Sequence, residues 1–451
     1  MALQPNQKKV IDQCSRGAVE NALSSQLALL RTRVWVASGN RYAEQTVKRV
    51  RDDYYAPGSG LKSADFQDYM IASIPLHATD GWSFLGRAAQ AHVHGDADAA
   101  RHLAYYAELR AALALLGSEG LAVLQDDHFA LTAPSKLRRI PTPPRLGTHY
   151  LVWAALEHWS DQAASAGLLT SIVAPGQIPL TVWMAAFSSG ATTPALVGKR
   201  LLRQWGVDLQ RLADDREARN DSSYRPTRIF TRPHISASER AQFLEDMWSG
   251  YQPFPASPFE IIDRHVLRLS LEQTFMAQTN LSAAAAKGKP LFRLRVEKML
   301  GSINPTILGT AEWISFLTRS SEPQDLELLV AARLKLATSN PKHHIGVMAR
   351  AGLLLRLATG ACARLFQVAG VGSKDLEFWW QPYGAQFGLW EPGSVPTQLT
   401  DLWADVADAL VDLGGWRASA AKSEYSFLKE QSAALIQLAT CERVALWGLG
   451  L

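Results

Sequence analysis

The sequence is poor in cysteine and lacks the motifs of several common enzyme classes. Its 451 residues include three cysteines, at positions 14, 362 and 441, and no CxxC pair, which excludes a zinc ribbon and a thioredoxin-like redox site. So few cysteines predict no disulfide framework and favour a reducing, cytoplasmic location. The patterns GxxxxGK[ST], GxSxG and HExxH are absent, as is GxGxxG after a strand. P-loop hydrolysis, serine hydrolysis, zinc proteolysis and dinucleotide binding are therefore disfavoured.

Long uninterrupted apolar runs are also missing. The first 17 residues contain two lysines but no apolar stretch after them, so we expect no signal peptide. The most apolar segment, residues 345–371, is interrupted by Arg350, Arg356 and Arg364. An arginine at the centre of a bilayer costs roughly 3 kcal/mol. This segment is therefore predicted to be a buried helix, and no membrane association is expected.

The composition that remains is that of a folded protein. Apolar residues make up 47% of the chain and charged residues 20%, whereas a disordered chain is poorer in large apolar residues and richer in one sign of charge. The 46 basic residues slightly exceed the 42 acidic residues, for a net charge of +4. This balance permits a nucleic-acid partner without requiring one.

Apolar residues recur every three or four positions over most of the chain, which is the period of an amphipathic helix. The expected fold class is all-α, with a multi-helix bundle followed by a second helical array. Only residues 121–123 and 129–131 resemble strands. Clusters of helix-breaking residues predict an N-terminal helical arm over 1–60, a helical bundle over 61–235 and a C-terminal helical domain over 236–451. Four tryptophans fall on helical periods and are expected in the core, namely Trp153, Trp159, Trp205 and Trp313.

Two basic stretches without any acidic residue flank the predicted bundle. One lies between Phe129 and Leu156 and contains residues 133–145, which read as a proline-rich loop; the other lies between Ser222 and Ser238. Clustered arginines suit contact with phosphates, although a basic loop is also commonly just solvated. The candidate RNA-binding residues are Arg138, Arg139, Arg145, Arg225, Arg228 and Arg232.

Residues 99–131 resemble the central segment of HEPN domains. The matching features are Tyr105-Tyr106-Ala107 in an alanine-rich helix, Leu115-Leu116 followed by Gly120, and Asp127-His128 in the next loop. HEPN domains carry their functional motif in a later helix, as an arginine, often followed by asparagine, and then a histidine. Arg219-Asn220 falls where that motif is expected, with Tyr224 in place of the histidine. The resemblance covers about residues 80–230.

This resemblance implies a bundle that is commonly dimeric and, in active members, metal-independent RNA cleavage that uses no cofactor. In such a reaction a base takes the proton of the ribose 2′-hydroxyl, and a cation stabilises the charge that develops on the phosphate. Arg219 suits the second role, and Asn220 can orient it. Tyr224 has an ordinary pKa near 10 and is a poor base at neutral pH. His128 or His92 is then expected to reach the site from another part of the bundle.

Two functions stay open from the sequence. The first is a HEPN-like endoribonuclease effector or toxin of a prokaryotic defence or toxin–antitoxin system. The second is a non-catalytic helical adaptor in a multi-protein antiphage complex, since the motif lacks its histidine and the residues after 235 carry no chemical signature. A protein partner or a homodimer is expected in either case. The candidate partner surface is Trp379, Trp380 and Trp390, in a segment broken by proline and glycine, because aromatic residues are enriched at interfaces.

A metal-dependent hydrolase is a third and less favoured hypothesis. It would use His92, His94, Asp96 and Asp98. The two histidines are separated by one residue, so on a helix their side chains diverge by about 200° and do not hold one ion easily. No metal site is therefore expected.

Overall fold

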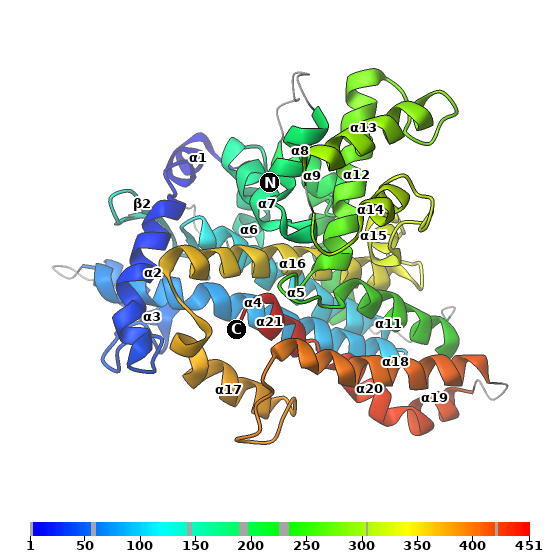
Figure 1. Cartoon of the computed structure of the whole chain (residues 1–451). Helices are drawn as coiled ribbons and strands as arrows, with labels where there is room; N and C mark the ends of the chain where they lie inside the picture. Colours follow the sequence, from blue (N-terminus) through cyan, green and yellow to red (C-terminus); the bar gives the residue numbers. More distant parts are fainter. Residues whose placement is uncertain are drawn as a thin grey trace.

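The chain is almost entirely helical, as Figure 1 shows. The structure is a computed structural model that describes residues 3–55, 60–141, 147–188, 197–224, 234–303, 305–419 and 423–451, except for the side chains of residues 213 and 221–224. The expected all-α class is confirmed, with one small sheet in the described part. The α-helices are α1 (Pro5–Ile11), α2 (Arg16–Arg31), α3 (Thr46–Tyr55), α4 (Ser63–Val93), α5 (Ala97–Ser118), α6 (Thr148–Ser160), α7 (Ala163–Ile172), α8 (Leu180–Ser188), α9 (Gly198–Trp205), α10 (Leu209–Tyr224), α11 (Ala237–Tyr251), α12 (Glu260–Thr279), α13 (Gly288–Ser302), α14 (Thr310–Leu317), α15 (Glu327–Arg333), α16 (His343–Ala369), α17 (Glu377–Gln386), α18 (Trp403–Ala418), α19 (Glu424–Glu430), α20 (Ser432–Ala439) and α21 (Glu442–Gly448).

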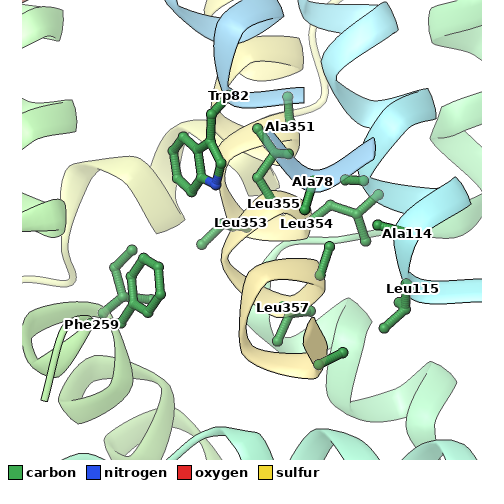
Figure 2. Packing of buried hydrophobic residues seen from close by; sticks show 14 of the residues in the cluster. Ala78, Trp82, Ala114, Leu115, Phe259, Ala351, Leu353, Leu354, Leu355 and Leu357 are labelled. Atoms are coloured by element: carbon green, nitrogen blue, oxygen red, sulfur yellow. The ribbon is translucent and has the colours of Figure 1, made fainter. Parts of the chain in front are cut away.

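Helix α16 forms the centre of the core and packs along α4 and α5 (Figure 1). Figure 2 shows its Leu353, Leu354, Leu355 and Leu357 near Ala78 and Trp82 of α4 and Ala114 and Leu115 of α5. Each buried leucine contributes roughly 1.5–3 kcal/mol through the hydrophobic effect. By length and composition α16 is the one described helix able to cross a membrane, but 89% of its most apolar window is buried inside the protein. The prediction of a buried helix over residues 345–371 is thus confirmed.

The hairpin of α4 and α5 turns at Gly95 and Asp96, two residue types that favour tight turns. Gly95 takes a φ of 72°, in the left-handed region that favours glycine. The Asp96 carboxylate then accepts a hydrogen bond from the backbone N–H of Ala99 and caps α5. Along α5 six alanines are fully buried, namely Ala100, Ala104, Ala107, Ala111, Ala112 and Ala114. Their small side chains let α4 and α16 approach closely.

The sheet contains three antiparallel strands in the order β1 (Leu121–Val123), β2 (His128–Thr132) and β3 (Lys136–Arg139). The first two lie where strands are predicted. The prediction of a loop over 133–145 is wrong for residues 136–139, because β3 pairs with β2 from Phe129↔Arg139 to Thr132↔Lys136. Three of the four β3 residues are basic, so the strand lacks the apolar alternation by which a strand is recognised in a sequence.

Several helices in the second half differ from the sequence pattern. The segment 422–446, which reads as one helix, contains the three short helices α19, α20 and α21. Helices α13 and α17 each carry a proline, Pro290 or Pro382, and a proline in the sequence argues against a helix. Gly206 ends α9 with a φ of 109°. The four tryptophans predicted in the core are all buried.

The hydrophobic core extends across the boundary predicted at residue 235. Helix α16 belongs to the predicted C-terminal domain, whereas α4 and α5 belong to the predicted bundle. The buried apolar residues of the described chain form one cluster from Leu3 to Leu449. The predicted segments therefore share a core.

Substitutions at two glycines test how tightly α4 packs against the C-terminal helices. A Cβ at Gly86 of α4 would lie 2.4 Å from the backbone oxygen of Ala439 and 3.2 Å from the backbone nitrogen of Cys441, whereas a Cβ at the exposed Gly415 of α18 would meet nothing within 4 Å. Gly86→Ala should lower the free energy of unfolding by about 1–3 kcal/mol through overpacking. Gly415→Ala should raise it by roughly 0.5–1 kcal/mol through helix propensity. Urea unfolding of both variants measures these free energies. Equal changes in the two variants would contradict the described packing.

Candidate functional site

Helix α10 presents Arg219 to the tyrosines that carry the HEPN resemblance. It packs against α5 and α6. The half-buried Arg219 guanidinium lies over the rings of Tyr105 and Tyr106, 5.2 and 5.6 Å from their centroids. Such cation–π contacts contribute roughly 0.5–2 kcal/mol each and fix the orientation of the cation. The two sequence features that suggested the resemblance are therefore in contact.

Two histidines contact the tyrosines that hold Arg219. His149, at the start of α6, places its Nδ1 2.8 Å from the Tyr105 hydroxyl, and its ring centroid is 6.1 Å from that of Tyr106. His102, on α5, has its ring centroid 5.1 Å from that of Tyr106. Both histidines are half-buried. Together with Arg219 they form what we call the Arg219 cluster: Arg219, His102, His149, Tyr105 and Tyr106.

Burial and the nearby arginines keep both imidazoles neutral. Burial lowers the pKa of His102, and the charge of Arg219 lowers it further. Burial likewise lowers the pKa of His149, followed by the charges of Arg219 and Arg216. Burial raises the pKa of Tyr105 to about 12, so this hydroxyl stays protonated. At neutral pH the cluster thus combines a fixed positive charge with two unprotonated nitrogen bases.

A second arginine extends the positive charge along α10. The Arg216 guanidinium lies 4.2 Å from the ring centroid of Tyr150, which is exposed on α6. Asn220 follows Arg219 on the exposed side of the helix. Arg216 and Asn220 thus add hydrogen-bond donors to the helix that carries Arg219, and such donors suit the oxygens of a phosphate group.

Beneath the Arg219 cluster a buried ion pair joins α10 to α16. Asp215 lies one helical turn before Arg219, and both of its oxygens accept hydrogen bonds from Arg350 at 2.6–3.0 Å. Glu108 of α5 lies 3.6 Å from the same guanidinium and is fully buried. Burial, reinforced by the charge of Asp215, raises the pKa of Glu108 well above its usual range. The ion pair holds the backbone of α10 at the position that brings Arg219 to the tyrosines.

The structure places the other predicted catalytic residues as follows. His128 lies in β2 and is buried, with its backbone paired to Val123 of β1. Tyr224 is the last residue of α10, and its side chain is outside the described residues. His92 is buried in α4, where its Nδ1 lies 2.8 Å from Nε2 of His344. The histidines that the described contacts bring to Arg219 are His102 and His149, which the sequence reasoning missed.

A sequence signal existed for one of these two histidines. His102 is four residues before Tyr106 on α5, so both occupy one helix face. His149 lies on a different helix, and only tertiary packing brings it to Tyr105.

Of the six candidate RNA-binding arginines, the structure describes two. Arg138 is exposed on β3 and donates to the side chain of Gln13 at 2.8 Å. Arg139 pairs with the buried Asp127 at 2.7 Å and stacks on Tyr54 and Tyr55, so it also serves the fold. The remaining four lie outside the described residues: Arg145, Arg225, Arg228 and Arg232.

The three tryptophans of the predicted partner surface pack largely within the chain. Trp380 is buried, and its ring centroid lies 6.1 Å from that of the half-buried Trp390. Trp379 packs edge-on against Trp35, with 5.4 Å between the centroids. Their part in binding a partner stays a prediction.

The residues of the hypothetical metal site have other interactions. His92 contacts His344, His94 is exposed and lies 2.8 Å from the Gln90 carbonyl oxygen, and Asp96 caps α5. Asp98 forms an ion pair with Arg101. Among the described residues, no group of three or more histidine, cysteine, aspartate or glutamate side chains is arranged to hold a metal ion.

Comparisons of the chain with protein-family models, with curated proteins and with solved structures found no match. The HEPN resemblance therefore rests on the residues quoted from the sequence and remains a prediction.

The electrostatic link between Arg219 and the two histidines is open to direct measurement. Arg219→Ala should raise the pKa values of His102 and His149, because it removes a positive charge that disfavours the imidazolium. Burial remains, so both values should stay below that of a free histidine. Histidine titration followed by NMR provides the readout, with Arg203→Ala on the exposed face of α9 as the control. Unchanged pKa values in Arg219→Ala would show that the residues are not neighbours.

Proposed function

We propose that the chain is a metal-independent endoribonuclease whose active site is the Arg219 cluster. The observation that supports this most strongly is a half-buried arginine held on two tyrosine rings, which in turn contact His102 and His149. RNA cleavage by the 2′-hydroxyl needs a base and a cation, and it needs no metal. The cluster contains both groups. In this proposal a histidine of the cluster takes the role of the histidine that the sequence motif lacks at position 224.

In the proposed reaction His149 acts as the base. We propose the tautomer in which its Nδ1–H donates to the Tyr105 oxygen, which also accepts from Trp153 Nε1 at 3.3 Å. Nε2 then takes the proton from the ribose 2′-hydroxyl, and the 2′-oxygen attacks the adjacent phosphorus. The bond from phosphorus to the 5′-oxygen breaks, and His102 in its protonated form, which is populated at acidic pH, gives its proton to that oxygen. The products are a 2′,3′-cyclic phosphate and a 5′-hydroxyl.

Arg219 and Arg216 act on the phosphate in this proposal. Negative charge grows on the non-bridging oxygens as the 2′-oxygen attacks, and fixed guanidinium groups stabilise it without reorganising. Arg219 is pre-positioned by the two tyrosine rings, so little conformational entropy is lost when it binds the phosphate. Such an enzyme would suit the effector or toxin role considered from the sequence, since unregulated RNA cleavage slows growth.

Removal of the cation tests the proposal most directly. Arg219→Ala should reduce RNA cleavage by roughly 10²–10³-fold, the usual loss when a group that stabilises the transition-state charge is removed. The assay follows purified protein on total tRNA and mRNA in the presence of EDTA, which should not affect the rate. Arg203→Ala should cleave like wild type. RNA that stays intact with a high concentration of wild-type protein would refute the proposal.

The pH dependence of cleavage tests the roles of the two histidines. The reaction needs His149 neutral and His102 protonated, and both pKa values are lowered from 6.5. The rate should therefore follow a bell-shaped curve with its maximum below pH 6.5. His149→Gln should remove the acid limb and His102→Gln the alkaline limb, each with a rate loss of about 10²-fold or more. A maximum above pH 7 would contradict these assignments.

The second candidate function is the non-catalytic adaptor. Helices α18 and α20 pack against each other, and each carries a largely exposed apolar side chain. Val411 on α18 is 74% exposed and Ile436 on α20 is 64% exposed, which favours the adaptor. An adaptor should retain a partner protein equally well as wild type and as Arg219→Ala, and the paired variant Val411→Asp with Ile436→Asp should lose it. Co-purification of these variants distinguishes the adaptor from the ribonuclease.

A further inference from the structure

A cavity of about 660 Å³ lies beside α16, between the end of α7 and the segment that leads into α12. Its α16 wall includes residues 356, 360, 363, 364 and 367, whose spacing places them on one helix face. Ile172 and Phe259 form opposite parts of the wall, and Gly448 closes it near the end of α21. The volume is within the range of small-molecule sites. None of these residues belongs to the Arg219 cluster.

Arg356 is one of the buried polar residues that line this cavity, and one of its nitrogens is unsatisfied. Its side chain is 5% exposed. Nε and one terminal nitrogen, NH2, bind the two oxygens of Asp263 at 2.7 and 2.6 Å, and NH2 also donates to the Ile172 carbonyl at 2.8 Å. The other terminal nitrogen, NH1, has no hydrogen-bond partner among the described residues. A buried N–H without an acceptor costs free energy, which a bound acceptor would recover.

The unsatisfied nitrogen packs directly against Gly360 of the same helix. A Cβ added at Gly360 would lie 2.6 Å from Arg356 NH1 and 3.3 Å from Ile172. A Cβ at Gly448 would lie 2.7 Å from the Phe259 ring. The absence of these two side chains therefore lets Arg356 NH1 and the Phe259 ring pack directly on the helix backbones that line the cavity. The guanidinium is rigid there, since it also lies 4.9 Å from the centroid of the Phe259 ring.

The charges around the cavity favour an anion. The Asp263 charge is taken up by Arg356, and the exposed Arg364 lies two turns further along the same face of α16. Phe366 and Val371 add apolar wall. An arginine fork recognises phosphate oxygens well, and the apolar wall suits an organic body attached to the phosphate.

We propose that this cavity binds a small phosphomonoester of about nucleotide size, with its phosphate on Arg356 NH1 and Arg364 and its organic part against Phe259. The site is separate from the proposed ribonuclease site, so either proposal can fail while the other stands.

Binding is tested on the full chain by isothermal titration and thermal shift, with AMP as the probe. Adenosine and succinate serve as comparisons that lack the phosphate or replace it with carboxylates. AMP should bind and raise the melting temperature, whereas adenosine and succinate should bind at least tenfold more weakly. Equal binding of AMP and adenosine, tighter binding of succinate, or no binding of AMP would overturn the proposal.

Two variants locate the binding in the cavity. Arg364→Glu reverses the exposed charge, and Gly360→Ala places a Cβ 2.6 Å from Arg356 NH1, which displaces that nitrogen without a change of charge. Each should weaken AMP binding by tenfold or more. Arg364 hydrogen-bonds only to Gln367 in the described structure, so this variant should fold normally, which the melting temperature without AMP will show. The control Arg203→Glu makes the same charge change on α9. Unchanged AMP affinity in a folded Arg364→Glu variant would overturn the proposal.

Discussion

The structure depends on the burial of a helix that carries arginines. Helix α16 supplies the apolar centre of the core, yet Arg350 and Arg356 are buried in it almost completely. A buried guanidinium without a counter-ion is strongly unfavourable, and breaking such a pair typically costs about 3–5 kcal/mol. Each arginine therefore needs a carboxylate from a neighbouring helix, and Asp215 of α10 and Asp263 of α12 provide them. These two pairs fix how α10 and α12 lie against the centre of the molecule.

The same constraint sets up both proposed sites. On one side of α16, the pair of Arg350 with Asp215 fixes α10, and one turn later Arg219 reaches the tyrosines of α5. On another side, the pair of Arg356 with Asp263 uses two of the three guanidinium nitrogens and leaves NH1 beside the cavity. The first ion pair positions the proposed active site. The second is itself part of the proposed phosphate site.

Local features of the structure could be predicted from the sequence to a large extent, and the candidate site only in part. The turn at Gly95 and Asp96 could be predicted because glycine conformation and helix capping depend on residues next to each other in the chain. Strand β3 could not, since only pairing with β2 stabilises so basic a segment. Arg219 was identified by resemblance, and the structure adds its contact with Tyr105 and Tyr106. His149 was missed, because a histidine at the start of a helix has no pattern that distinguishes it from a solvated one.

The sequence alone established the helical class, the buried character of α16 and a core position for its regularly spaced tryptophans, because each follows from periodicity and local propensity. Tertiary structure decided which charged groups meet. Arg350 is 135 residues from Asp215 in the chain, and His149 is 44 residues from Tyr105. Interactions between residues close in sequence do not select such pairs. They form because the helices pack at orientations that bury apolar faces, and the polar groups that become buried then need partners from whichever helix lies opposite.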